Sequence, residues 1–225
     1  MTTPTTGTTP APNFDRLYSG DPDPWQVATS WYEQRKISTV LASLRRPTYR
    51  LAWDAGCGTG ELTAALTARA RQVVATDASH EAVSLSRTRL SSADIGADTG
   101  AVRVELSALP ARPECLVEAP DLVIVSEVLY YLSPDDRQAA YALIDDVAAK
   151  DADLVLVHWG PQADDADVSG LAAFNEATEE LNARGWGRLV THIDPEFVLG
   201  LFSADIPEHV GGRDGDPSHN EADHR

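Results

Sequence analysis

The chain has 225 residues, of which 43% are hydrophobic and 24% are charged. This length can bury one full core but is too short for two independent enzyme domains. The sequence holds 18 Lys and Arg against 35 Asp and Glu, a formal net charge of -17, and such a surface repels nucleic-acid phosphates and anionic lipid heads. We therefore expect neither nucleic acid nor a membrane among its partners.

Targeting and metal-binding signals are also missing from the sequence. No apolar run approaches the roughly 20 residues that span a bilayer, and the first residues lack the charged and apolar parts of a secretory signal. Cys57 and Cys115 are far apart and have no histidines at ligand spacing, which supports neither a disulfide nor a zinc site. The sequence predicts a cytoplasmic protein without a metal, whose chemistry depends on side chains or an organic cofactor.

Composition divides the chain into one domain and two tails. Residues 1–13 and 208–225 are polar, rich in Gly, Pro or Thr and without periodicity, so they are predicted to be disordered, the second as an acidic tail. Residues 14–207 are predicted to form a single domain, in which residues 14–46 make an N-terminal lid and helix segment.

The first predicted helix covers residues 31–44. Ser30 and Glu33 have the spacing of a capping box. Apolar residues recur at i, i+3, i+4 and i+7, so one face should pack on a sheet: Ile37, Val40, Leu41 and Leu44.

Strands and helices then alternate along the chain. Strands are predicted at 51–53, 72–76, 102–106, 121–125 and 154–157, further helices near 62–66, 79–90, 134–147 and 172–184, and a closing hairpin at 188–192 and 197–202. The strand at 121–125 is an unbroken apolar run of the type buried on both faces of a parallel sheet. The predicted fold is a three-layer, Rossmann-like α/β sheet of seven mostly parallel strands with an antiparallel closing strand.

A glycine-rich turn follows the first predicted strand. Gly56, Gly58 and Gly60 stand at alternate positions after Asp54, so a ligand can reach the backbone and the amides of the next helix. This spacing differs from the Gly-x-Gly-x-x-Gly dinucleotide fingerprint, whose last glycine admits a pyrophosphate. The turn therefore favours a nucleoside without a pyrophosphate, and Cys57 is a small residue that fits inside it.

Acidic residues end the first two strands. Asp77 closes the second strand, where its carboxylate can accept both hydroxyls of an adenosine ribose; a helix-capping acid is the structural alternative. Asp54 can accept from a cofactor ammonium, directly or through water. The turn and Asp77 together favour an adenosyl ligand.

Three features resemble the class I S-adenosylmethionine-dependent methyltransferases: the loop DAGCGTGE, the acid Asp77, and the run SEVLYYL after the fourth strand. The N-terminal segment resembles that of the NodS-like methyltransferases, in residues 14–44, FDRLYSGDPDPWQVATSWYEQRKISTVLASL. The likeness runs from Phe14 to Trp159. It implies the class I methyltransferase fold, S-adenosyl-L-methionine as cofactor and an amino sugar as acceptor, because the namesake nodulation protein N-methylates an amino sugar of a chitooligosaccharide.

The resemblance also implies further cofactor contacts. Trp25, in DPDPW, is expected beside the cofactor, with Ala78, Ser107 and Ala108 on the adenine side. Relatives often carry an acid near the position of Ser107, so adenine recognition is expected to depend on backbone groups.

Glu127 and His158 are the catalytic candidates, because they follow the fourth and fifth strands at the edge of the sheet. Glu127 can orient an ammonium or amine; the alternative is a supporting carboxylate that fixes a loop or contacts the cofactor. His158 titrates near neutral pH and can take the proton of the acceptor; a loop histidine bonded to the backbone is the alternative.

Aromatic side chains are expected to cover the site, because their faces stack on sugars and attract a sulfonium. The candidates for the substrate side are Tyr18, Tyr32, Tyr130, Tyr131 and Trp159. For the residues before the first strand, anchoring of the first helix in the core is the alternative, and one of Tyr130 and Tyr131 should turn inward.

The sequence thus predicts a methyltransferase that uses S-adenosyl-L-methionine and N-methylates an amino sugar or a similar small molecule. The alternatives are O-methylation of a sugar or other small molecule, a nucleotide-dependent oxidoreductase, and a non-catalytic protein that binds the cofactor. The acceptor's identity and the oligomeric state do not follow from the sequence.

Overall fold

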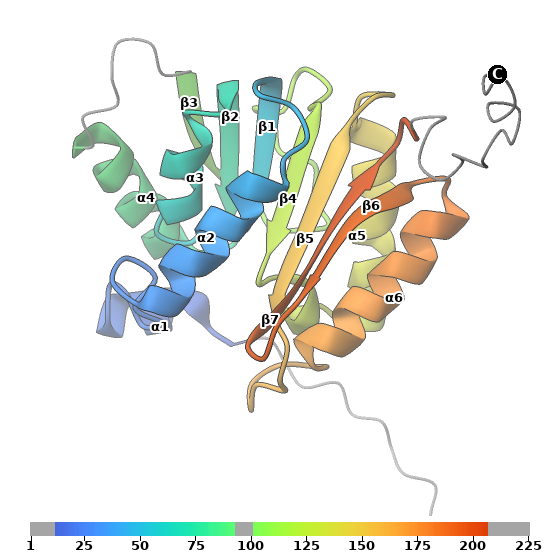
Figure 1. Cartoon of the computed structure of the whole chain (residues 1–225). Coiled ribbons are helices and arrows are strands. Elements are labelled where there is room, and N and C mark those ends of the chain that lie inside the picture. Colours follow the sequence, from blue (N-terminus) through green and yellow to red (C-terminus); the bar gives the residue numbers. More distant parts are fainter. Residues whose placement is uncertain (1–11, 93–100, 207–225) are drawn as a thin grey trace, which may run out of the picture.

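A computed structural model describes residues 12–92 and 101–206 of the chain. Its centre is one seven-stranded sheet with the strand order β3-β2-β1-β4-β5-β7-β6 (Figure 1). Most of the predicted tails, residues 1–11 and 207–225, lie outside the described residues.

The strands agree with the predicted α/β topology. They are β1 Tyr49–Ala55, β2 Ala70–Asp77, β3 Ala101–Leu106, β4 Leu122–Ser126, β5 Asp153–Trp159, β6 Gly187–Ile193 and β7 Phe197–Ser203. The first five pair in parallel, and β7 runs antiparallel between β5 and β6. The prediction of a mostly parallel sheet with an antiparallel closing strand is confirmed.

Helices cover both faces of the sheet. They are α1 Phe14–Gly20, α2 Trp31–Ser43, α3 Glu61–Leu66, α4 His80–Ser92, α5 Pro134–Val147 and α6 Gly170–Ala183, with a 3-10 turn at Leu129–Tyr131. Residues of α2 and α3 share one apolar cluster with the sheet, and residues of α5 and α6 share the other. Figure 1 shows α2 crossing the near face of the sheet, which makes the three layers.

Serine caps start three of the predicted helices. The hydroxyls of Ser30, Ser79 and Ser133 accept hydrogen bonds from backbone amides one turn into α2, α4 and α5. The capping box at α2 is only half formed, because the Glu33 carboxylate accepts from Lys36 and the Ser30 amide donates to the Gln26 carbonyl. The reciprocal half of that prediction is wrong.

Two features near the site differ from the predicted elements. Helix α1 was not predicted, because its side chains have little apolar periodicity and Tyr18 is its buried residue. Strand β5 continues through His158 to Trp159, so His158 lies within the strand and not in the loop after it. The registry with β7, where His158 faces Val198, extends the strand this far.

Candidate active site

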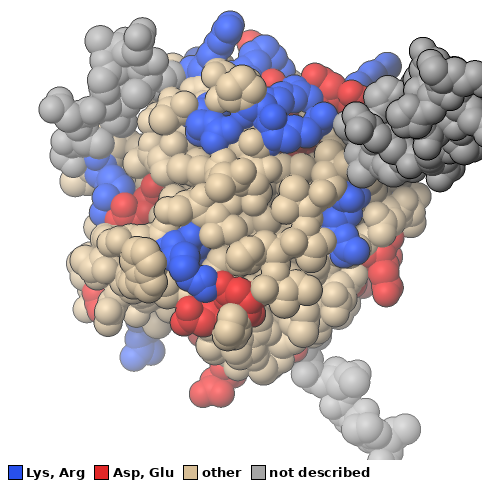
Figure 2. All heavy atoms as spheres, in the orientation of Figure 1, with Lys and Arg blue, Asp and Glu red and all other residues tan. Residues whose placement is uncertain are grey.

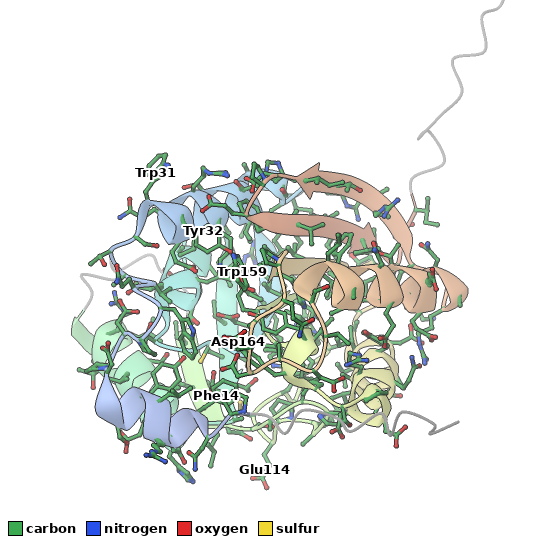
Figure 3. The ribbon with its side chains drawn as sticks, turned by 90° about the horizontal axis from the view of Figure 1, so that it is seen from below. Phe14, Trp31, Tyr32, Glu114, Trp159 and Asp164 are labelled. Carbon is green, nitrogen blue, oxygen red and sulfur yellow. The ribbon has the colours of Figure 1, made fainter. Side chains whose placement is uncertain are left out.

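The carboxyl ends of β1, β2, β4 and β5 meet at the lower edge of the sheet in Figure 1, and Figure 3 views this edge from below. Ligands of open α/β sheets bind at this edge, where the strand order reverses. Here the order reverses between β1 and β4. The loop after β1 and the segment after β4 therefore form the centre of the candidate site.

The glycine loop needs its glycines for conformation and for space. Gly56, Gly58 and Gly60 have φ angles of 95°, 51° and 87°, which side chains rarely tolerate. A Cβ at residue 56 would lie 2.2 Å from Cγ2 of Val128, and one at residue 60 would lie 2.6 Å from Oγ of Ser86. The loop is thus pressed against the segment after β4 on one side and against α4 on the other.

Asp77 is tied to this loop by its carboxylate. Oδ2 accepts from the Gly58 amide and Oδ1 from the Ser79 amide, each at 2.9 Å, while burial raises the pKa of Asp77. The Ser107 amide donates to the Asp77 carbonyl at 2.9 Å. Ala78 and Ala108, the next residues along, are exposed. The structure therefore brings the predicted ribose acid and the predicted adenine-side residues together.

Asp54 is fully buried beneath the loop. Its Oδ2 accepts from the hydroxyl of Thr63 at 2.6 Å, whereas Oδ1 has no hydrogen-bond partner in the described parts of the chain. Burial raises its pKa to about 6. A buried carboxylate oxygen without a donor is costly, so this atom is fitted to receive a donor from a ligand.

The N-terminal segment lies over the glycine loop. The hydroxyl of Tyr18 is 3.1 Å from the point that a Cβ at residue 58 would take. The Tyr18 ring meets Trp25 edge-on at 5.6 Å, and Phe14 meets Tyr131 edge-on at 5.2 Å. Tyr18 is buried and Trp25 is partly exposed, so Tyr18 stands at the glycine loop and Trp25 packs against its ring.

Glu127 receives four donors. Its Oε1 accepts from Lys36 Nζ at 2.6 Å and from the Tyr32 hydroxyl at 3.3 Å, and its Oε2 accepts from the Tyr130 hydroxyl at 2.8 Å and the Trp159 amide at 2.7 Å. Lys36 is the main partner that holds the pKa of Glu127 below its ordinary value, against the effect of burial. The φ of Glu127 is 60°, a strained value that these contacts maintain.

Sequence reasoning missed Glu33 and Lys36. Both are buried in α2, and Lys36 Nζ is 2.9 Å from Glu33 Oε1. The signal was present in the spacing, because positions 33, 36, 40 and 44 recur on one helical face and the last two, Val40 and Leu44, are apolar. Charged residues on an apolar face indicate a buried partner elsewhere in the fold.

His158 is sealed from solvent. Neither ring nitrogen has a hydrogen-bond partner among the residues that the structure describes, and the Tyr130 ring meets the imidazole edge-on at 5.6 Å. Burial lowers its pKa to about 4, so the ring is neutral at physiological pH. The loop histidine bonded to the backbone, the alternative weighed for this residue, is not what the structure shows.

The other aromatic residues that the sequence predicts at the site lie either against Glu127 or at the surface. Tyr32 and Tyr130 donate to Glu127, and Tyr130 is the inward member of its pair. Tyr131 is half-buried against Tyr130, and the Trp159 ring is partly exposed. Trp31 is 73% exposed and points away from the site in Figure 3.

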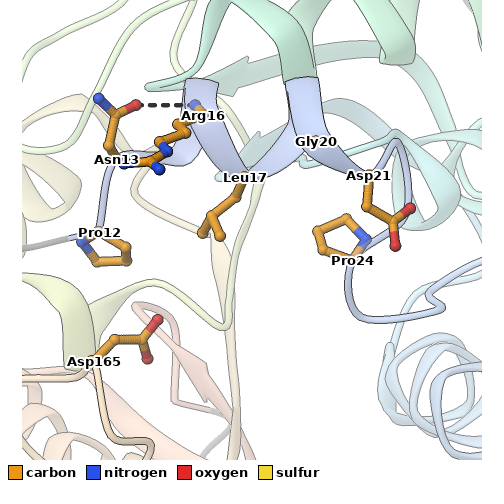
Figure 4. Close-up of a pocket in the computed structure, with 8 residues that line it drawn as sticks. All are labelled: Pro12, Asn13, Arg16, Leu17, Gly20, Asp21, Pro24 and Asp165. Atoms are coloured by element: carbon orange, nitrogen blue, oxygen red, sulfur yellow. Dashed lines mark hydrogen bonds between the residues drawn. The ribbon is translucent and has the colours of Figure 1, made fainter.

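A hollow of about 490 Å³ opens beside α1 (Figure 4). It lies between α1 and the segment after β5, and its lining residues are Pro12, Asn13, Arg16, Leu17, Gly20, Asp21, Pro24 and Asp165. Asp165 raises the pKa of Tyr131, after burial. Phe14, which follows the lining residue Asn13, meets the Tyr131 ring, and Tyr131 packs against Tyr130, a donor to Glu127.

Within residues 12–92 and 101–206, no group of three or more His, Cys, Asp or Glu side chains is arranged to hold a metal ion. The same ranges contain no helix with the length and apolarity needed to cross a membrane.

Comparison with known protein families identifies the family to which this chain belongs. Residues 16–184 match the family described as Nodulation protein S (NodS). The chain belongs to the NodS family. Nodulation protein S of Bradyrhizobium diazoefficiens is 28% identical to this family member over 172 residues, which are 72% of this chain and 78% of the relative.

Solved structures confirm the predicted class I fold of this NodS family member. A crystal structure of a provisionally assigned methyltransferase from Pseudomonas syringae is 32% identical, with a TM-score of 0.64 over 77% of this chain and 99% of that chain. The N-methyltransferase NodS from Bradyrhizobium japonicum WM9, crystallised with S-adenosyl-L-homocysteine, is 18% identical, with a TM-score of 0.65 over 84% of this chain and 94% of that chain.

Proposed function

We propose that this NodS family member is an S-adenosylmethionine-dependent methyltransferase that methylates the nitrogen of an amino sugar or a similar small amine. The family match and the N-methyltransferase activity named for the crystallised NodS support the proposal. The single observation that carries it is the buried Oδ1 of Asp54, a carboxylate oxygen to which no described residue donates, beneath a loop of three left-handed glycines.

The residues at the loop fit an adenosyl amino acid. Asp54 Oδ1 would accept from the ammonium of the cofactor, and Asp77 would accept from the ribose hydroxyls with the lone pairs that Gly58 and Ser79 leave free. Tyr18 and Trp25 would cover the loop and exclude water. Ala78, Ser107 and Ala108 would border the adenine.

The charges at the site favour an amine over a hydroxyl as acceptor. When bound, S-adenosylmethionine supplies an electrophilic methyl group on a sulfonium, and transfer to an amine moves its positive charge to the acceptor nitrogen. Glu127 stays ionised because Lys36 and three other donors surround it, so its negative charge stabilises a cation beside it. Its oxygens are already occupied, so Glu127 acts through charge more than as a proton acceptor.

A hydroxyl acceptor would need a strong base. Glu127 has a lowered pKa, and His158 is buried with a pKa of about 4. Neither of these side chains is suited to remove a proton from an alcohol. An amine can lose its proton to water and enter the site in its neutral form. It therefore needs no strong base from Glu127 or His158.

The hollow beside α1 offers an approach for the acceptor. Asp21 and Asp165 line it together with Arg16, and carboxylates suit the hydroxyls and the ammonium of an amino sugar. Tyr131 packs against Phe14 and against Tyr130, which donates to Glu127. These rings would line the path of an acceptor from the hollow to Glu127.

Calorimetry tests the cofactor. S-adenosylhomocysteine should bind the purified protein, and NAD should not, because the loop spacing does not provide for a pyrophosphate. Binding of NAD with no heat from S-adenosylhomocysteine would overturn the proposal in favour of an oxidoreductase.

Radiolabelled transfer tests the acceptor class. With labelled S-adenosylmethionine, glucosamine and its oligomers should accept the methyl group, and the N-acetylated forms should not. Label on the N-acetylated forms would indicate O-methylation, and cofactor binding without transfer to amines or alcohols would indicate a non-catalytic protein.

A further inference from the structure

The cluster around Glu127 contains two carboxylates and one ammonium. Lys36 is 4% exposed, and its Nζ lies 2.9 Å from Glu33 Oε1 and 2.6 Å from Glu127 Oε1. The same Nζ stands 4.9 Å from the centre of the Tyr32 ring. The remaining donors to Glu127 are hydroxyls and an amide, which carry no charge. With all three ionised, the cluster has a net charge of one negative unit.

Glu33 is the residue that makes the cluster negative. A pair of Lys36 and Glu127 alone would be neutral and would already hold the Glu127 carboxylate in place. In the described part of the chain, Lys36 is the hydrogen-bond donor to the Glu33 side chain. A second buried carboxylate on one ammonium costs desolvation that a neutral pair avoids, and burial accordingly raises the pKa of Glu33. A cation brought to the site would offset this cost.

The cluster adjoins the proposed cofactor loop. Val128 follows Glu127 in the chain, and its Cγ2 lies 2.2 Å from the Cβ position of residue 56. Glu33 and Lys36 reach the same edge of the sheet from α2, on the segment before the first strand. Charge at this edge is thus assembled from two separate parts of the fold.

We infer that Glu33, Lys36 and Glu127 form one charge unit that makes the transfer site prefer a cation over a neutral group. This inference rests on the proposed function, in which the cofactor carries a cationic sulfonium before transfer and a neutral thioether after it. Lys36 is a positioning residue, because it holds the Glu127 carboxylate and limits the unit to one net negative charge.

Two nucleosides measure this preference without an acceptor. S-adenosylhomocysteine is neutral at the sulfur, whereas sinefungin has an ammonium in place of the methylsulfonium. The ratio of their dissociation constants, from calorimetry at one pH and ionic strength, reports how strongly the site favours a cation. Folding defects change both constants together and leave the ratio unmoved.

Three variants separate net charge from the presence of particular side chains. Glu33→Gln makes the unit neutral, and Glu33→Asp changes the side chain but keeps the unit at one negative charge. Glu118→Gln is the matched control, since it removes the same charge from the protein at an exposed position before β4. Every variant is first checked for folding by circular dichroism.

The preference for sinefungin should fall roughly threefold to tenfold in Glu33→Gln, stay within about twofold of the original protein in Glu33→Asp, and stay constant in Glu118→Gln. An unchanged ratio in Glu33→Gln, or a ratio in Glu33→Asp as low as that in Glu33→Gln, would overturn the inference while S-adenosylhomocysteine still binds. Failure of the original protein to bind either nucleoside would instead overturn the proposed function.

Discussion

The carboxylate of Asp54 is buried, so its negative charge is unfavourable until a ligand binds. The folded state raises its pKa from 3.8 to about 6, so folding favours the protonated carboxyl. The stability that this group contributes is present below pH 3.8 and is lost as pH rises through 6. At neutral pH the ionised Asp54 therefore destabilises the protein without its ligand.

Replacing Asp54 with Asn should increase the free energy of unfolding at pH 8 by about 1 to 3 kcal/mol and change it little at pH 4. The same variant should lose affinity for S-adenosylhomocysteine, because an amide carries no charge for the ligand ammonium. Urea unfolding at the two pH values, together with calorimetry, measures both effects. Equal stability changes at pH 4 and pH 8 would show that the charge of Asp54 is not the cause.

Asp77 combines a structural and a proposed binding role. Asp77→Asn should reduce the affinity for S-adenosylhomocysteine about tenfold to one hundredfold, because the ribose hydroxyls lose a charged acceptor. The melting temperature should change only slightly, since the amide oxygen can still accept from Gly58 or Ser79. The matched control is Asp151→Asn, an exposed position in the segment before β5, which should leave the affinity unchanged.

The burial of His158 predicts that stability depends on pH in the opposite direction to that expected from Asp54. Burial lowers its pKa from 6.5 to about 4, so the unfolded chain binds a proton between these values and the folded protein does not. Stability from this group is present above pH 6.5 and falls as pH drops toward 4. In His158→Leu, the free energy of unfolding, measured by chemical denaturation between pH 4 and 7, should decline less steeply as pH falls. A decline as steep as in the original protein would place its origin in other groups.

At the scale of elements, the Asp15 carboxylate hydrogen-bonds α1 to the start of α4. Asp15 Oδ1 accepts from the Ser79 hydroxyl at 2.7 Å and from the Glu81 amide at 3.3 Å. Ser79 also donates its amide to Asp77, so the lid is connected to the proposed ribose site through one residue.

Asp15→Ala should loosen the lid and raise the dissociation rate of S-adenosylhomocysteine several-fold, with little effect on the melting temperature because α1 buries little apolar surface. Stopped-flow fluorescence can follow the release, since Trp25 is partly exposed and packs against Tyr18, whose hydroxyl stands at the glycine loop. Arg16→Ala, in the same helix, is the control for helix propensity. An unchanged release rate in Asp15→Ala would mean that this contact does not hold the lid.

Local signals made much of the fold predictable. Hydroxyl caps and apolar spacing identified α2, α4 and α5, and β-branched runs identified the central strands, because these patterns depend on residues close in the sequence. The pairing of Glu127 with Lys36 spans 91 positions. The charged residues on the apolar face of α2 indicated a buried partner without saying which residue it is, so the sequence identified Glu127 without its main partner. The burial of His158 was missed for the same reason, since it depends on β7, Tyr130 and the start of α6.

At the scale of the whole molecule, charge is unevenly distributed. Figure 2 shows Lys and Arg gathered at the upper end of the visible face, where the parallel strands begin. Arg45, Arg46 and Arg50 belong to this end, and they pair with acidic residues that precede or open β4 and β5. The opposite edge holds Asp54, Asp77 and the Glu127 cluster, so basic residues are concentrated away from the proposed site.

This asymmetry, on a chain of net charge -17, should steer cationic ligands to the site. S-adenosylmethionine carries one net positive charge and S-adenosylhomocysteine none, so only the first should depend strongly on salt. Between about 20 mM and 300 mM sodium chloride the association rate of S-adenosylmethionine should fall roughly threefold to tenfold, because screening shortens the reach of the field. The rate for S-adenosylhomocysteine should change by less than about twofold, since a neutral ligand is not steered. If the association rates of both nucleosides fell equally with salt, the salt effect would come from the protein's conformation. If neither rate fell, the acidic edge would not guide the cofactor.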